Sequence, residues 1–261
     1  MGGQDAHVLS SLLAYGNAAE IQDAQASNYD VSALFAGGNA NWIASVSTIS
    51  APHDGTTLAP YLVDNIPFLK DFVLDIVDLI DTALPATTNI YNFRLDQWGI
   101  SPQQNGESFD DYLTRITSSS LFQDTNDISI FDLSPLGART INENYPLAST
   151  IPYFSYASLG TSKALLGNTQ VPDITTLVFM WPTETILGSY TASSPVRIDS
   201  SWWPNDGVVN SNSMQGPTLG ASSSNVVAYD GNAYYGKFSF VSTYSGYDHL
   251  GTLMFAPHVT V

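Results

Sequence analysis

Two residues in the C-terminal part of the chain, Asp206 and His249, have types and an order that could support hydrolysis. Asp206 stands in the run Asn205-Asp206-Gly207, where an Asp-Gly pair is first of all a turn signal. His249 follows it, in a predicted loop shortly after a predicted strand. An acid followed by a late histidine is the chain order of the acid and base in Ser…Asp…His hydrolases. Taken alone, a turn aspartate and a surface histidine are the commoner interpretation, so the spacing only suggests this chemistry.

A third feature is Met1-Gly2-Gly3, at the head of a predicted helix. In a nucleophile elbow, Gly-x-Ser-x-Gly, the serine sits on a sharp turn between a strand and a helix. Small residues after the serine let the backbone pass close to the strand. The small residues and the helix are present here, whereas the serine that would precede them is not, so this signal is weak by itself.

The elements that must position these residues follow from hydrophobic periodicity. The long amphipathic region 61–84 pairs a wide apolar face with a row of aspartates, which fits either an ordinary packed helix or a movable cap over an apolar pocket. The turn-rich loop 51–57 follows a predicted strand, at the strand end where α/β sheets bind ligands. We predict helices at 7–15, 107–116 and 135–144, and strands at 42–50, 153–159, 175–180, 226–229 and 238–244. This pattern indicates an α/β domain with an inserted cap.

The charge balance excludes several classes of partner. The chain has 24 acidic and 7 basic residues and a formal net charge of −17, which argues against binding nucleic acid or anionic membranes and leaves neutral lipids or esters as substrates. The absence of cysteine excludes disulfides and thiolate metal sites. Aspartates interrupt the most apolar stretch, 66–84, so we expect no transmembrane segment, and no signal peptide is visible in this chain.

Several motifs, taken in order, resemble the lipases of staphylococci and thermophilic bacilli, a subfamily of α/β-hydrolases with a large lid and a structural zinc. Met1-Gly2-Gly3-Gln4 is similar to the end of the family's His-Ser-x-Gly-Gly-Gln elbow. The further matching segments are Ser50-Ala51-Pro52-His53-Asp54-Gly55-Thr56-Thr57-Leu58, Leu95-Asp96-Gln97-Trp98-Gly99, Gly106-Glu107-Ser108-Phe109, Asp132-Leu133-Ser134 with Gly137-Ala138, Asn205-Asp206-Gly207-Val208-Val209-Asn210 with Ser213-Met214, and Asp248-His249-Leu250. Any one match could be chance, but seven matches in the family's order along nearly the whole chain are specific to this family.

The resemblance implies a role for each of these positions. Asp206 would be the triad acid, His249 the general base, and the backbone amide of Met1 one oxyanion donor. It also implies an incomplete α/β-hydrolase fold over residues 1–261, a sheet without its N-terminal strands, and a lid inserted at about 58–145.

The family's metal sites are only partly represented. Asp96 resembles the family's aspartate ligand to zinc, but a single carboxylate cannot make a tetrahedral site, so we expect structural zinc only in a longer protein. Calcium is not expected, because Gly251 replaces the family's glutamate and Ala256-Pro257 its Asp-Pro pair. Catalysis requires no cofactor in this interpretation.

The sequence therefore predicts a triacylglycerol lipase or broader carboxylic-ester hydrolase whose nucleophilic serine would stand directly before Met1. The alternative is a non-catalytic, hydrolase-like protein that binds apolar ligands. We expect this chain alone to be inactive and aggregation-prone, because it lacks the serine and the preceding strands. By resemblance, the full-length protein would be extracellular; the oligomeric state stays open.

Overall fold

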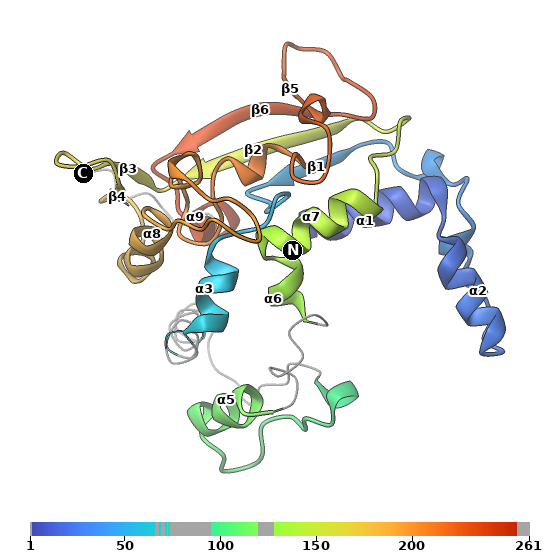
Figure 1. Ribbon diagram of the computed structural model, residues 1–261, viewed down its shortest axis with the longest axis horizontal. Coiled ribbons are helices and arrows are strands. Elements are labelled where there is room, and N and C mark those ends of the chain that lie inside the picture. Colours follow the sequence, from blue (N-terminus) through green and yellow to red (C-terminus); the bar gives the residue numbers. More distant parts are fainter. Residues whose placement is uncertain are drawn as a thin grey trace. The chain divides into compact units, whose positions relative to one another are not determined.

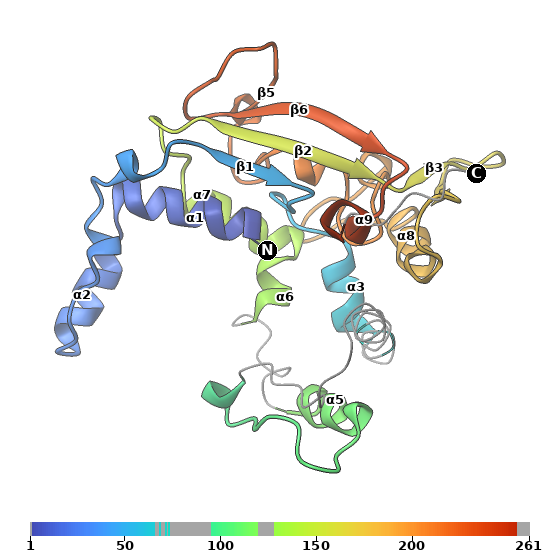
Figure 2. The same ribbon diagram turned by 180° about the vertical axis from the view of Figure 1, so that it is seen from behind.

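The computed structural model describes residues 2–65, 68, 71, 73, 95–119 and 128–254. The chain divides into two compact units, Met1–Leu58 with Asp132–Val261, and Ala59–Phe131. The first unit contains a sheet with helices against it (Figures 1 and 2). None of the helices within the described residues is both long and apolar enough to cross a membrane.

A four-stranded parallel sheet organises the first unit, in the order β1-β2-β6-β5. Its strands are β1 (Val46–Ile49), β2 (Tyr153–Leu159), β5 (Val226–Ala228) and β6 (Phe238–Ser245). β2 lies between β1 and β6, and the register of β2 on β6 shifts between Ser155 and Tyr156. Parallel strands bring their carboxyl ends to one edge of the sheet, so loops from distant parts of the sequence meet there.

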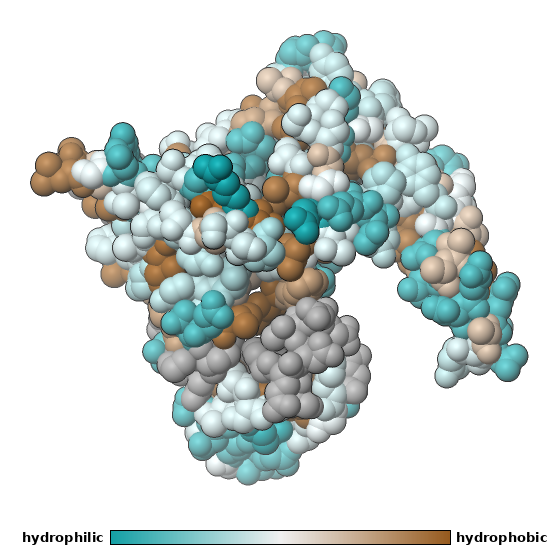
Figure 3. Space-filling model, in the orientation of Figure 1, coloured by the Kyte–Doolittle hydropathy of each residue, from teal (hydrophilic) through white to brown (hydrophobic). Residues whose placement is uncertain are grey.

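A short antiparallel hairpin, β3 (Thr161–Lys163) and β4 (Gln170–Pro172), follows β2. Its tip carries Leu165 and Leu166, which are fully or almost fully exposed. In the orientation of Figure 1 this hairpin lies at the left, where Figure 3 shows a hydrophobic projection.

Helices α1 and α7 lie on one side of the sheet (Figure 2). The α-helices are α1 (Gly2–Tyr15), α2 (Ala18–Ala26), α3 (Leu58–Asp64), α5 (Phe109–Thr117), α6 (Ser129–Asp132), α7 (Pro135–Asn144), α8 (Trp181–Leu187) and α9 (His249–Met254). The 3-10 helices are η1 (Ala33–Ala36), η2 (Ala40–Trp42), η3 (Asp96–Trp98), η6 (Val178–Met180), η7 (Ser200–Trp202), η8 (Ser213–Gln215) and η9 (Ser223–Asn225).

The core under the sheet is built on two fully buried aromatic side chains, Tyr153 of β2 and Phe238 of β6. Their rings lie 5.0 Å apart, and Val46 and Ile151 pack with them. The Tyr153 hydroxyl is 2.8 Å from Ser10 Oγ of α1. Ala6 and Ala14 of α1 pack against this cluster, and the burial of these apolar groups with the aromatic rings holds the helix to this face of the sheet.

The second unit has a separate small core of Ile100, Tyr112, Leu113 and Ile116. Ser108 caps α5 by accepting a hydrogen bond from Asp111 N at 3.1 Å. The predicted lid at 58–145 includes this unit, and its role as a lid stays a prediction.

Most of the predicted elements are confirmed within a few residues, notably 135–144, 153–159, 226–229 and 238–244. The strand predicted at 175–180 is wrong, because Thr176 N closes a turn on Asp173 O and η6 follows. The strand predicted at 42–50 is shorter than expected, since η2 includes Trp42. Most of the amphipathic region 61–84 lies outside the described residues.

Candidate active site

Asp206 is held by a tight loop that joins η7 to η8. Asn205 and Asn210 form an isolated bridge across this loop, and Asp206 N donates to Val209 O at 3.1 Å. Gly207 takes a φ of +89°, a conformation that favours glycine, and its N–H donates to Asn205 Oδ1 at 2.8 Å. The Asp206-Gly207 pair therefore forms the turn that its sequence indicates, and this turn also positions Asp206 in the candidate site.

The Asp206 side chain is fully buried and accepts four hydrogen bonds. Its Oδ1 accepts from Val208 N at 3.1 Å and Val209 N at 2.8 Å. Its Oδ2 accepts from Ser158 Oγ at 2.5 Å and lies 2.8 Å from His249 Nδ1. A carboxylate with this many donors stays in one orientation and keeps its hydrogen-bonding capacity satisfied inside the protein.

His249 is the first residue of α9, directly beyond β6, so it starts a helix and does not lie in the predicted loop. Its backbone N–H donates to Asp206 O at 2.9 Å, which ties it to the acid loop through the main chain as well as the ring. Because Asp206 only accepts, Nδ1 carries the proton, and Nε2 of the neutral ring is left with a lone pair. That is the tautomer a general base needs.

The electrostatic surroundings of His249 favour its protonated form. Burial of the ring lowers its pKa, but the charge of Asp206, their hydrogen bond and the charge of Asp248 outweigh burial, so the pKa of His249 is raised above 6.5. The side chain remains 19% exposed, while that of Asp206 is not exposed at all. The acid is therefore sealed behind the histidine, and only the histidine can meet a reactant.

The start of α1 lies close to the C-terminal end of β1. A Cβ added to Gly3 would lie 2.3 Å from Ala51 Cβ and 3.2 Å from Thr48 Cγ2, so only glycine permits this approach. This is the close contact that an elbow requires of its small residues. Met1, the predicted oxyanion donor, lies outside the described residues.

The predicted zinc ligand Asp96 is exposed and begins η3 in the second unit. Nowhere in the described ranges do three His, Cys, Asp or Glu side chains gather as a metal site would require. Residues of the described chain alone therefore do not fit a tetrahedral zinc site, and Asp96 would supply at most one ligand.

The loop Ala51–Thr57 at the end of β1, which matched the family motif, is fully buried and structural. His53 is neutral, because burial and the nearby His7 lower its pKa to about 3. Its Nε2 is 2.9 Å from Thr48 Oγ1 and its ring lies 4.4 Å from that of Phe238. Asp54 accepts from Thr218 N, Leu219 N, Asn142 Nδ2 and the Thr218 hydroxyl, and so fastens this loop to α7 and to the segment after η8.

Sequence reasoning missed Glu184 of α8, which is fully buried beside the acid loop. Two glycines make room for its side chain. A Cβ added to Gly160 would lie 2.6 Å from Glu184 Oε1, and a Cβ added to Gly207 would lie 3.2 Å from Glu184 Cγ. Burial, and then the charges of Asp248, Asp206 and Asp173, raise the pKa of Glu184 to about 8, against the effect of a hydrogen bond from Thr176. Its neighbours in the sequence gave no signal, since a lone glutamate in a short helix is usually exposed.

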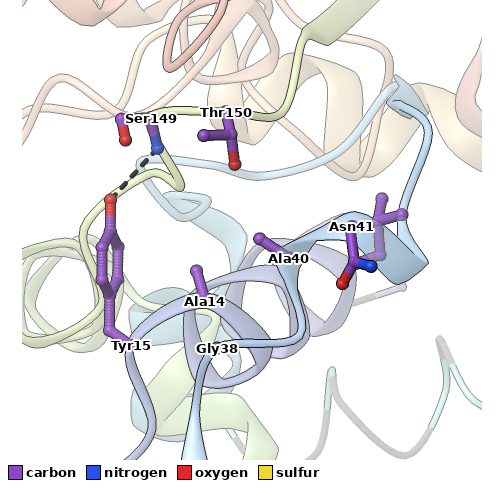
Figure 4. Close-up of a pocket in the computed structure, with 8 residues that line it drawn as sticks. Ala14, Tyr15, Gly38, Ala40, Asn41, Ser149 and Thr150 are labelled. Carbon is purple, nitrogen blue, oxygen red and sulfur yellow. Dashed lines mark hydrogen bonds between the residues drawn. The ribbon is translucent and has the colours of Figure 1, made fainter.

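A hollow away from Asp206 and His249 lies between α1, the segment around η2, and residues 149–150 (Figure 4). It is lined by Ala14, Tyr15, Gly38, Ala40, Asn41, Ile43, Ser149 and Thr150, and the Tyr15 hydroxyl accepts from Ser149 N at 3.1 Å. None of these side chains is a carboxylate, imidazole or amine, so this hollow holds no acid–base chemistry comparable to Asp206 and His249.

A family model described as the lipase-like C-terminal domain matches residues 1–254. The chain belongs to this family. The predicted relationship to staphylococcal lipases is confirmed: a lipase of Staphylococcus hyicus is 31% identical over 95% of this chain and 36% of its own length. Lipase 1 of Staphylococcus aureus is 32% identical over 83% of this chain and 30% of its own length. The chain thus spans about a third of the length of these relatives.

Solved structures of related proteins have the same fold. EstA from Clostridium botulinum superposes with a TM-score of 0.84 and 34% identity, over 97% of this chain and 58% of its own. Lipase 1 from Pelosinus fermentans superposes with a TM-score of 0.76 and 36% identity, over 96% of this chain and 63% of its own. The predicted partial α/β-hydrolase fold is confirmed by these neighbours and by the parallel sheet flanked by helices.

Proposed function

We propose that this lipase-family chain supplies the acid and the base of a carboxylic-ester hydrolase of the triacylglycerol lipase type. The observation that carries the proposal is the contact of 2.8 Å between His249 Nδ1 and Oδ2 of the buried Asp206 carboxylate, which accepts four hydrogen bonds in all. In this proposal the nucleophile is the serine that the resemblance puts before Gly2-Gly3. His249 Nε2 takes the serine proton and returns it to the leaving alcohol.

The roles of the surrounding groups follow from the same chemistry. Asp206 fixes the tautomer of His249 and stabilises the imidazolium formed as the serine attacks. The Met1 amide is proposed as one donor to the oxyanion. The segment about 58–145, which includes the unit Ala59–Phe131, is proposed as the lid over an apolar acyl site.

The substrate class and location are part of this proposal. A net charge of −17 disfavours anionic surfaces and supports a neutral lipid or ester as substrate. We infer from the staphylococcal relatives that the whole protein acts outside the cell. A zinc ion would need ligands besides Asp96, and catalysis would not require it. Calcium is not proposed, because Gly251, whose N–H donates to Asp248 Oδ1 at 2.7 Å, has no carboxylate to bind it.

The test is hydrolysis of p-nitrophenyl butyrate by the protein that contains this chain. We expect turnover that is lost in His249→Ala and retained in a control, Asp230→Asn, which alters an exposed aspartate bonded only within its own loop. A fluorophosphonate probe should label one serine, and mass spectrometry should place it two residues before Gly2, at the position directly before Met1. Binding of an apolar ester without turnover, or turnover that survives His249→Ala, would favour the non-catalytic alternative or a different site.

A further inference from the structure

A chain of buried hydroxyl groups leads from the end of β1 to the Asp206 carboxylate. Ser158, the next-to-last residue of β2, has no exposed surface, and its Oγ lies 2.5 Å from Asp206 Oδ2. Ser50 directly follows β1 and is 1% exposed, and its Oγ lies 2.7 Å from Ser158 Oγ. On its other side Ser50 Oγ is 3.4 Å from Thr252 Oγ1 of α9. The series closes at the histidine, because Thr252 Oγ1 donates to His249 O at 2.8 Å.

The direction of these hydrogen bonds follows from counting protons. Each hydroxyl has one proton to donate. Ser158 faces a carboxylate oxygen at 2.5 Å and the thioether of Met214 at 3.5 Å, so its proton goes to Asp206. The Thr252 hydroxyl already donates its proton to His249 O, so it does not donate to Ser50. Ser50 must therefore be the donor to Ser158, and both hydroxyl dipoles point toward the carboxylate.

The backbone of Ser50 is held in an unusual conformation that places this hydroxyl. Its φ of +53° is one of two positive values among the non-glycine residues that the structure describes. Such values are disfavoured for residues with a Cβ and persist where the surroundings enforce them. Here Ser50 N still donates to Tyr156 O at 2.9 Å, so the strand ladder continues while the side chain turns inward to Ser158.

Neither serine is placed to be the nucleophile. Both are buried, and Ser158 bonds to the acid and not to the free Nε2 side of His249. Nor do these serines merely fill space in the core. Ser239 on β6 is an example of a serine that does: it is equally buried, but its hydroxyl has no hydrogen-bond partner among the described residues. The hydroxyls of Ser50 and Ser158 are instead joined in series to one carboxylate oxygen.

We propose that Ser158 is a positioning residue for the acid, and that Ser50 acts through it by polarising the Ser158 hydroxyl. Together they hold Asp206 Oδ2 toward His249 and disperse its charge. The inference rests on the proposed function only in that Asp206 and His249 are taken as acid and base. Hydrogen bonds in series strengthen one another, so loss of the outer member should weaken the inner one.

The consequence is measurable at His249 without any turnover. Removing the Ser158 hydroxyl leaves Asp206 with two backbone donors and the histidine. An under-solvated carboxylate attracts the histidine proton more strongly, so the pKa of His249 should rise by about one unit in Ser158→Ala. The other carboxyl groups facing this region, Asp248 and Glu184, are unchanged by the substitution.

The experiment is a side-chain NMR titration of His249 in the protein that contains this chain and in its variants. Ser158→Ala should raise the pKa of His249 by about one unit, and Ser158→Cys, whose thiol is a weaker donor, by about half of that. Ser50→Gly deletes the outer hydroxyl and suits the positive φ, so it should fold and give a smaller rise. The control Ser239→Ala removes an equally buried hydroxyl outside the series and should leave the pKa unchanged.

The double variant Ser50→Gly with Ser158→Ala separates a series from two independent contacts. If Ser50 acts through Ser158, the double variant gives the same pKa as Ser158→Ala alone. Additive shifts would overturn the role of Ser50. A pKa of His249 that is unchanged in both Ser158→Ala and Ser158→Cys would overturn the whole proposal, whatever their melting temperatures. Since the readout needs no substrate, absence of esterase activity in the whole protein would sink the proposed function and leave this inference standing.

Discussion

Replacing Glu184 with glutamine should change how the stability of the protein depends on pH. Glu184 is fully buried, its Oε1 has no hydrogen-bond partner among the described residues, and Asp206, Asp248 and Asp173 surround it with negative charge. These causes raise its pKa from 4.5 to about 8. The folded protein therefore keeps a proton that the unfolded chain releases between these two values.

The sign and size of the effect follow from that difference. Because the folded state binds the extra proton, rising pH favours the unfolded state; the contribution is complete below pH 4.5 and is lost progressively as the pH rises from 4.5 to about 8. Each pKa unit corresponds to about 1.4 kcal/mol, so the whole contribution is about 5 kcal/mol. That is comparable to the total stability of many domains. Glutamine has the same shape, can face Thr176 with its amide, and does not ionise.

The assay is urea unfolding followed by tryptophan fluorescence at several values between pH 5 and pH 8.5. The free energy of unfolding of Glu184→Gln, minus that of the wild type, should increase by about 1.4 kcal/mol per pH unit from pH 5 and level off at about pH 8. Taking the difference cancels the contributions of His249, His7 and Asp54. The matched control is Glu20→Gln on α2, an exposed glutamate, for which the difference should stay flat. A flat difference for Glu184→Gln as well would refute the reasoning.

Substitutions at three further positions, Asp206, Asp54 and Gly55, test the site and its supporting loops. Asp206→Asn turns an amide donor toward His249 Nδ1, so hydrolysis of p-nitrophenyl butyrate by the protein containing this chain should fall about 10³- to 10⁴-fold; an undiminished kcat would contradict the assigned acid. Asp54→Ala removes a buried carboxylate that accepts four hydrogen bonds and should lower the free energy of unfolding by about 3–5 kcal/mol in urea titrations, whereas Asp54→Asn keeps Oδ1 and should lose less; equal losses would argue against the anchoring role. Gly55→Ala and Gly231→Ala both place alanine at positive φ, +82° and +96°, but only the Cβ at Gly55 meets backbone, 2.6 Å from Ser134. Thermal melts should show a loss of unfolding free energy of about 1 kcal/mol for Gly231→Ala and more than twice that for Gly55→Ala. Equal losses would show that the backbone at Gly55 shifts to accommodate the added Cβ.

The sequence was sufficient for features encoded by residue type and local spacing. The helix at Pro135–Asn144 and the strand at Tyr153–Leu159 have strong periodic patterns and match the structure. The order of Asp206 and His249, together with the family motifs, indicated a pair that the structure brings within 2.8 Å. Elements with weaker patterns were less predictable: Thr176 prefers a turn with Asp173 and a bond to Glu184, so the strand predicted around it does not form.

Tertiary structure alone decided how the acid is supported. Ser50, Ser158 and Glu184 belong to segments far apart in the chain, and each could equally have been a surface residue. Their burial arises because parallel strands end at one edge, where the loops after β1, β2 and β6 converge on the Asp206 turn. Solvation and hydrogen-bond direction depend on this convergence. Residue type therefore specifies which groups could act as acid and base, while packing determines which groups surround them and at what pKa.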